Sequence, residues 1–138
     1  MDDNNVEVTA KDLREYSPRT LAYLGDAVFE LMVRAKFVSN GNAKVHALNR
    51  QTVSVVRATS QSKSYETLLP RLTEEEAAVL RRGKNAVTKT GAKSASYGQY
   101  SRATGVEALF GWLYLKGETM RIKELSNIIL KEAVNEQN

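Results

Sequence analysis

Apolar residues recur three and four positions apart along most of this 138-residue sequence, which is the spacing of one face of an α-helix. The first such run follows Ser17-Pro18 and stops before Gly41. A capping serine followed by proline begins a helix, and glycine commonly ends one. These signals predict a helix of about 22 residues, roughly 33 Å long. Its apolar positions include Leu21, Leu24, Val28, Leu31 and Ala35.

The same spacing continues to the end of the chain. Thr73 and Glu76 have the spacing of a helix-capping box, and we expect that helix to end at Gly83. Residues 85–98 show no periodicity and predict a loop. Further helices are expected over residues 45–59, 65–69, 100–116 and 120–134. No alternating strand pattern accompanies them, so we expect an all-α fold in which residues 1–138 form a single domain.

Composition excludes several kinds of site. The chain has no cysteine and one histidine, His46, so cysteinyl zinc sites and histidine cages are excluded and oxygen atoms must hold any metal ion. The longest apolar stretch, residues 21–33, contains Asp26 and Glu30 and is too short to span a bilayer. The acidic N-terminus does not resemble a secretory signal. We therefore expect a cytoplasmic protein without a membrane span.

The positive charge is concentrated in one segment. Residues 81–102 contain six basic residues and no acidic one, so subtracting this +6 from the net charge of +4 leaves −2 on the rest of the chain. An all-positive segment favours contact with a polyanion such as a phosphate backbone. A solvated, flexible loop is an equally good interpretation of the charge alone. The six residues are Arg81, Arg82, Lys84, Lys89, Lys93 and Arg102.

Two acidic residues lie within strongly apolar helical sequences. Asp26 follows Gly25, Glu107 precedes Gly111, and neither acid has a cation one helical turn away. We expect both carboxyl groups to be buried, and a buried carboxylate needs a compensating partner. If the two glycines bring these helices together, a shared Mg²⁺ would satisfy both acids and could promote phosphodiester hydrolysis. Alternatively, the acids bond to hydroxyl groups such as those of Tyr23, Tyr100 and Thr104.

These two acidic sequences resemble a known family. Leu24-Gly25-Asp26-Ala27-Val28-Phe29-Glu30 is similar to the signature helix of ribonuclease III nuclease domains. Val106-Glu107-Ala108-Leu109-Phe110-Gly111 is similar to their second acidic helix. Together with Arg82-Gly83-Lys84-Asn85-Ala86, the order and spacing resemble the short bacterial branch called mini-ribonuclease III.

The resemblance implies a homodimeric, magnesium-dependent endonuclease that cleaves double-stranded RNA and leaves 5′-phosphate and 3′-hydroxyl ends. It assigns Asp26 and Glu107 to the catalytic, metal-binding acids of the family. The branch is linked with maturation of large-subunit (23S) ribosomal RNA precursors, and a ribosomal protein is a candidate partner.

The sequence also departs from the longer family members. Ala22 and Thr104 occupy positions where full-length ribonuclease III has acids, which leaves open a catalytically silent, RNA- or ribosome-binding module. A helical protein-interaction domain is a further alternative. We expect no separate double-stranded-RNA-binding domain, so the nuclease domain itself would bind RNA. The expected RNA contacts are Arg82, Lys84, Asn85, Lys89 and Lys93.

Overall fold

The computed structural model describes residues 12–87 and 94–137, and these form helices without a strand. The prediction of an all-α fold is confirmed. No helix in these two ranges is long and apolar enough to cross a membrane. The helices are α1 (Pro18–Ser39), α2 (Val45–Val56), α3 (Ala58–Leu68), α4 (Glu74–Asn85), α5 (Ser94–Leu115) and α6 (Thr119–Gln137), with short 3₁₀ turns at Leu13–Glu15 and Leu69–Arg71.

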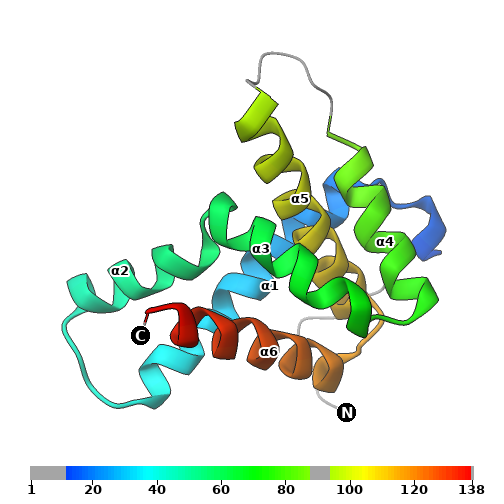
Figure 1. The fold of residues 1–138 in the computed structure, drawn as a ribbon. Coiled ribbons are helices and arrows are strands. Elements are labelled where there is room, and N and C mark those ends of the chain that lie inside the picture. The colour runs from blue at the N-terminus through cyan, green and yellow to red at the C-terminus, as the bar shows by residue number, and fades with distance from the viewer. Residues whose placement is uncertain (1–11, 88–93, 138) are drawn as a thin grey trace, which may run out of the picture.

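Helix α5 lies at the centre of the molecule, and α1, α3 and α4 pack against it (Figure 1). Every residue from Ala103 to Leu113 is buried except Glu107, which is half-buried. A helix that is apolar around its whole circumference must be covered on every side, and the surrounding helices provide that cover. The rings of Phe29 and Phe110 join α1 to α5, with centroids 5.2 Å apart.

Helix α4 continues through Gly83, so the prediction that this glycine ends the helix is wrong. A Cβ on Gly83 would lie 2.8 Å from the Cα of Gly105, and one on Gly105 would lie 2.6 Å from the carbonyl oxygen of Leu80. The two glycines therefore let α4 and α5 pack backbone to backbone. Burial at this contact outweighs the low helix propensity of glycine, which costs about 1 kcal/mol relative to alanine.

The expected helix over residues 45–59 is divided at Arg57, whose backbone is extended (φ −65°, ψ 156°). Side chains replace the backbone donors that a continuous helix would supply. Ser60 Oγ donates to the carbonyl oxygen of Ser54 at 2.6 Å, and Gln61 Nε2 donates to that of Val56 at 2.7 Å. These bonds depend on the direction in which α3 leaves α2. Helical periodicity carries no information about that direction, so it did not predict the break.

Helix α5 begins at Ser94 rather than near residue 100, so the predicted loop over residues 85–98 is too long. The sequence of the first turns of α5 has no regular apolar stripe that would have predicted a helix. The Tyr97 hydroxyl instead donates to the carbonyl oxygen of Val87, 3.1 Å away. Lys89 and Lys93 lie outside the described residues.

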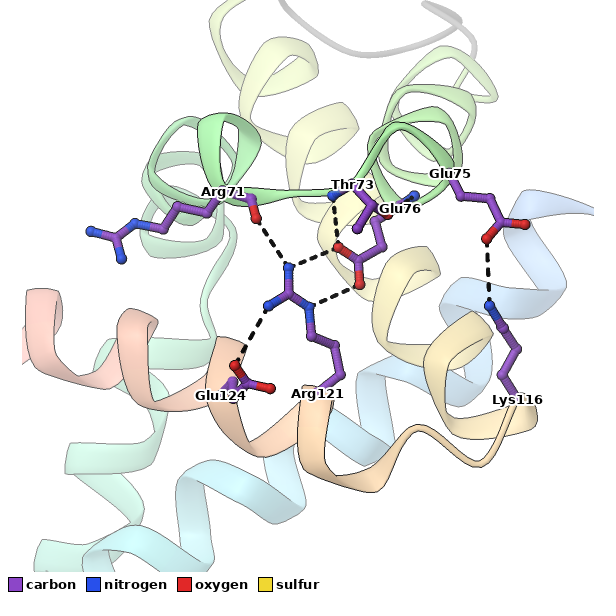
Figure 2. A network of polar contacts seen from close by, with 7 residues as sticks. All are labelled: Arg71, Thr73, Glu75, Glu76, Lys116, Arg121 and Glu124. Atoms are coloured by element: carbon purple, nitrogen blue, oxygen red, sulfur yellow. Dashed lines mark hydrogen bonds and ion pairs between the residues drawn. The ribbon is translucent and has the colours of Figure 1, made fainter.

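A polar network fixes the start of α6 to the start of α4 (Figure 2). Arg121 donates from Nε and Nη2 to the two carboxylate oxygens of Glu76, at 2.9 and 2.8 Å. Its Nη2 also donates to the carbonyl oxygen of Arg71 at 3.0 Å. Nearby, Lys116 Nζ lies 3.6 Å from Glu75 Oε1.

Candidate active site

One face of α1 and one face of α5 line a small pocket of about 240 Å³. Along α1 the lining residues are three and four positions apart, which places them on one side of the helix. The α5 residues follow the same spacing, and Val87 closes the pocket from the end of α4. The pocket is lined by Arg19, Ala22, Tyr23, Asp26, Val87, Tyr100, Thr104 and Glu107.

Glycines explain why the two acids meet. A Cβ on Gly25 would lie 1.6 Å from the carbonyl oxygen of Glu107, and one on Gly111 would lie 2.0 Å from that of Leu21. No larger residue fits either position unless the helix backbones separate. The prediction that these two glycines bring the acid-bearing helices together is confirmed, and Asp26 and Glu107 share one pocket as a result.

The predicted burial of both acids is wrong for Asp26, which is exposed, while Glu107 is half-buried. Only one side of α1 packs against α5, and several positions on its other side are exposed in the described structure. Tyr23 is 85% exposed and Leu31 is 60% exposed. An apolar sequence around most of α1 therefore does not mean that the helix is covered all round.

The Glu107 carboxyl is electrostatically unusual. Burial, followed by the neighbouring Asp26 carboxylate, raises the pKa of Glu107 to about 8, although a hydrogen bond from Gln61 opposes the increase. At neutral pH, Glu107 therefore keeps a proton that it can donate to Asp26. The alternative in which the acids bond to nearby hydroxyl groups receives little support at Thr104. Its hydroxyl proton is already used, because Oγ1 donates to the Tyr100 carbonyl oxygen at 2.9 Å.

The donor set fits a hydrated magnesium ion. Two adjacent carboxylates repel each other, and a divalent cation between them would remove both that repulsion and the Glu107 proton. Within the described ranges, no cluster of three or more His, Cys, Asp or Glu side chains could enclose a metal ion. Magnesium does not require such a cage, because it typically keeps several waters and binds one or two carboxylates.

Two other residues near the acids, Glu30 and Gln61, do not line this pocket. Glu30, the next acid along α1, lies outside the pocket and pairs with Arg34 at 2.8 Å. Gln61 contacts Glu107 but was not among the predicted site residues. Its sequence signal was weak: a polar residue on the same helical face as the buried Tyr65 and Leu68.

The predicted RNA contacts that the structure describes differ in their exposure to solvent. Arg82 and Asn85 are exposed in the last turn of α4, which leads to Val87 in the pocket wall. Lys84 is half-buried, with Nζ 5.5 Å from the centre of the Tyr65 ring. Arg102, at the end of the basic segment, pairs with Glu66 at 3.3 Å.

Comparison with known proteins agrees with this architecture. The sequence profile of the ribonuclease III domain matches residues 19–118, which include both acids and every residue that lines the pocket. The chain belongs to the ribonuclease III family.

Several relatives place the chain in the mini-ribonuclease III branch of that family. It is 38% identical to a mini-ribonuclease 3 from Clostridium tetani, over 90% of this chain and 83% of the relative. It is 44% identical to one from Symbiobacterium thermophilum, over 78% and 83%. A crystal structure of a Fusobacterium nucleatum protein matches with a TM-score of 0.77 and 36% identity, over 89% of this chain and 98% of that one. The resemblance inferred from the two acidic motifs is confirmed.

Proposed function

We propose that this ribonuclease III family member is a magnesium-dependent endoribonuclease that cleaves double-stranded RNA, with Asp26 and Glu107 as its metal-binding acids. Membership of the mini-ribonuclease III branch supports endoribonuclease activity over a catalytically silent module. The observation that carries the site assignment is the meeting of two carboxyl groups in one pocket between α1 and α5.

Asp26 and Glu107 have different tasks in this proposal. Exposed Asp26 offers its carboxylate from the solvent side, whereas Glu107 must first release the proton that it retains without metal. Mg²⁺, when bound, supplies Lewis acidity at the scissile phosphate and lowers the pKa of a water molecule. Ala22 and Thr104 add no charge to the pocket, so two carboxylates are the acids available there. Arg19 contributes a cation to the same pocket, suited to orienting a phosphate.

The basic segment would bind the RNA backbone outside the pocket. Exposed Arg82 and Asn85 stand where α4 ends beside the pocket wall, which supports phosphate contacts from these two residues. We propose Lys84, Lys89 and Lys93 as further contacts on the charge of the segment alone. Duplex RNA is recognised mainly through phosphates, 2′-hydroxyls and shape. Such contacts would position the duplex without selecting a sequence.

We also propose that the chain acts as a single nuclease domain that dimerises. Tyr23, Ala27 and Leu31 lie four residues apart along α1 and are exposed. An exposed apolar stripe of this kind is typical of an interface with another protein surface. A two-fold contact between two such stripes would bring two pockets into one assembly, one for each RNA strand.

The expected substrate is a precursor of large-subunit (23S) ribosomal RNA, which would place the enzyme in the cytoplasm. Support comes from the association of the mini-ribonuclease III branch with this maturation step. Cleavage of a 23S precursor duplex at a defined position, compared with an unrelated duplex of equal length, would test the preference. Adding candidate ribosomal proteins would test whether one stimulates cleavage.

Asp26→Asn should abolish magnesium-dependent cleavage of duplex RNA while leaving the protein folded. The change removes a charge from an exposed position without changing the size of the side chain. Cleavage is measured by gel electrophoresis with and without Mg²⁺, and folding by circular dichroism. We expect a loss of at least about 100-fold, the usual cost of losing an essential electrostatic group in a catalytic site.

Glu30→Gln is the matched control, because it removes an acid from the same helix but outside the pocket. This variant should cleave at close to the rate of the unmodified protein. Full magnesium-dependent activity in Asp26→Asn, or equal losses in both variants, would contradict the site assignment.

A further inference from the structure

Gln61 is a buried amide whose two polar atoms have different surroundings. The residue is 2% exposed and lies on the face of α3 that also carries Tyr65 and Leu68. Its Nε2 donates to the carbonyl oxygen of Val56 at 2.7 Å. Its Oε1 is buried and accepts no hydrogen bond in the described structure.

The break between α2 and α3 fixes the orientation of this amide. Because Arg57 is extended, the Val56 carbonyl lacks the donor that an uninterrupted helix would provide, and Gln61 takes its place. Exchanging the amide nitrogen and oxygen would bring two carbonyl oxygens together. The Nε2 group is therefore held on a defined side of the glutamine side chain.

The same side chain reaches the candidate active site from the interior. Gln61 is not among the residues that line the pocket, yet it lies within hydrogen-bonding reach of the Glu107 carboxyl. Glu107 thus has Asp26 as its neighbour at the pocket and Gln61 as its neighbour within the protein. A carboxylate that accepts a hydrogen bond from a fixed donor within the protein keeps its orientation when a metal ion binds on its pocket side.

An amide at position 61 is an unfavourable choice for packing alone. A buried acceptor without a partner lowers the free energy of unfolding, and Gln61 Oε1 is such an acceptor. An apolar side chain of similar length would remove that loss but would leave the Val56 carbonyl oxygen without its donor. The contact with Glu107 gives the amide a second role that an apolar side chain could not fill.

We propose that Gln61 is a positioning residue that holds the Glu107 carboxylate in the orientation required for metal binding. The inference rests on the proposed function of the Asp26–Glu107 pair. Gln61 acts through Glu107 and touches neither the RNA nor the reacting atoms.

Gln61→Met tests this role, because methionine is similar in length and has no amide. Mg²⁺ affinity is measured by calorimetry on the protein without RNA, and kcat and KM are measured with duplex RNA. We expect Mg²⁺ affinity to fall at least about tenfold, as for other residues that orient metal ligands. We also expect kcat to fall while KM for RNA changes less than about twofold, since phosphate contacts are unaffected.

Ser64→Ala is the matched control on the same helix. Ser64 is also buried, and its Oγ donates within α3 to the carbonyl oxygen of Ser60 at 3.1 Å. This variant should retain Mg²⁺ affinity and kcat. Unchanged Mg²⁺ affinity in Gln61→Met, or equal losses in both variants, would overturn the proposal.

A second measurement needs neither metal nor RNA. In the metal-free protein, Glu107→Ala should shift the side-chain amide resonances of Gln61 in a ¹H–¹⁵N spectrum, while Glu30→Gln should leave them in place. Unmoved Gln61 resonances in Glu107→Ala would overturn the contact whatever the activity. If the unmodified chain neither binds Mg²⁺ nor cleaves duplex RNA, the proposed function fails, and the spectrum still decides whether Gln61 holds Glu107.

Discussion

The Glu76 carboxylate combines two stabilising interactions at one residue. It completes a capping box with the Thr73 backbone N–H and pairs through both oxygens with Arg121 (Figure 2). Burial alone would raise the pKa of Glu76, but the hydrogen bonds from Arg121 and Thr73 outweigh it and lower the pKa below the usual value. The ionised form is therefore more favourable in the folded chain than in the unfolded chain.

Glu76→Gln should lower the free energy of unfolding at pH 7 by about 3 kcal/mol, because it leaves Arg121 without its buried partner. Urea denaturation at several pH values measures this difference. The stabilisation by Glu76 is present above its unfolded-state pKa, near 4.5, and is lost as pH falls through the lowered folded-state pKa. The two proteins should therefore converge in stability at acidic pH. A difference that stays constant down to pH 2 would show that ionisation of Glu76 is not its source.

Helix packing in this fold depends on positions where a side chain is absent. Gly25 and Gly111 allow α1 to meet α5, and Gly83 and Gly105 allow α4 to meet it from another side. Each contact brings backbone atoms closer than any Cβ would permit. The Asp26–Glu107 pocket is a direct product of the first contact, since it forms where α1 and α5 converge.

Gly25→Ala should destabilise the fold by more than about 3 kcal/mol, since the new methyl group would overlap the Glu107 carbonyl oxygen. Gly98→Ala in α5 is the control, because its Cβ would meet only Arg102 Nη1 at an ordinary 3.5 Å. That change should stabilise the protein by about 0.5–1 kcal/mol through helix propensity and reduced unfolded-state entropy. Thermal and urea unfolding measure both effects. Equal changes in the two variants would contradict close backbone packing at Gly25.

The whole molecule presents two surfaces that the proposed function uses: the apolar stripe on α1 and the basic segment around the end of α4. The stripe and the pocket share Tyr23, so dimerisation through α1 would place partner surfaces beside the candidate active site. The basic segment reaches the pocket from another element, through Val87. Duplex binding and subunit association would therefore meet at the same pocket.

Leu31→Asp should convert the proposed dimer to a monomer without unfolding it, because it places a charge within an exposed apolar stripe. Sedimentation velocity measures the change in mass, and circular dichroism checks the fold. Met120→Asp is the control, since Met120 is 71% exposed on α6, outside the stripe. A dimer that persists in Leu31→Asp, or a monomeric unmodified protein, would exclude this interface.

Replacing Arg82, Lys89 and Lys93 together by Gln should weaken duplex binding and flatten its dependence on salt. Each lost phosphate contact should reduce the slope of log K against log salt by about 0.9. Binding is measured between 50 and 200 mM salt, roughly the range over which such contacts lose most of their strength. Gln at Lys36, Lys123 and Lys131 removes the same charge from α1 and α6. An equal slope in both triple variants would remove the basic segment from the interface.

Local sequence signals predicted the fold class and much of the element order. Ser17-Pro18 and the Thr73–Glu76 capping box mark helix starts that the structure retains. Such signals work because caps and apolar spacing act within a few residues of the chain. They failed at Gly83 and Arg57, where contacts with distant residues decide whether the helix continues.

By itself, the sequence determined the all-helical fold, the family and the two acids with their flanking glycines. Only the tertiary structure decided that Asp26 is exposed, that Glu107 is half-buried beside it, and that Gln61 approaches Glu107 from within. Helical spacing specifies which residues share a face of one helix but not which helix covers that face. Burial, pKa and hydrogen-bond partners depend on that cover, because they arise between residues that are distant in the chain.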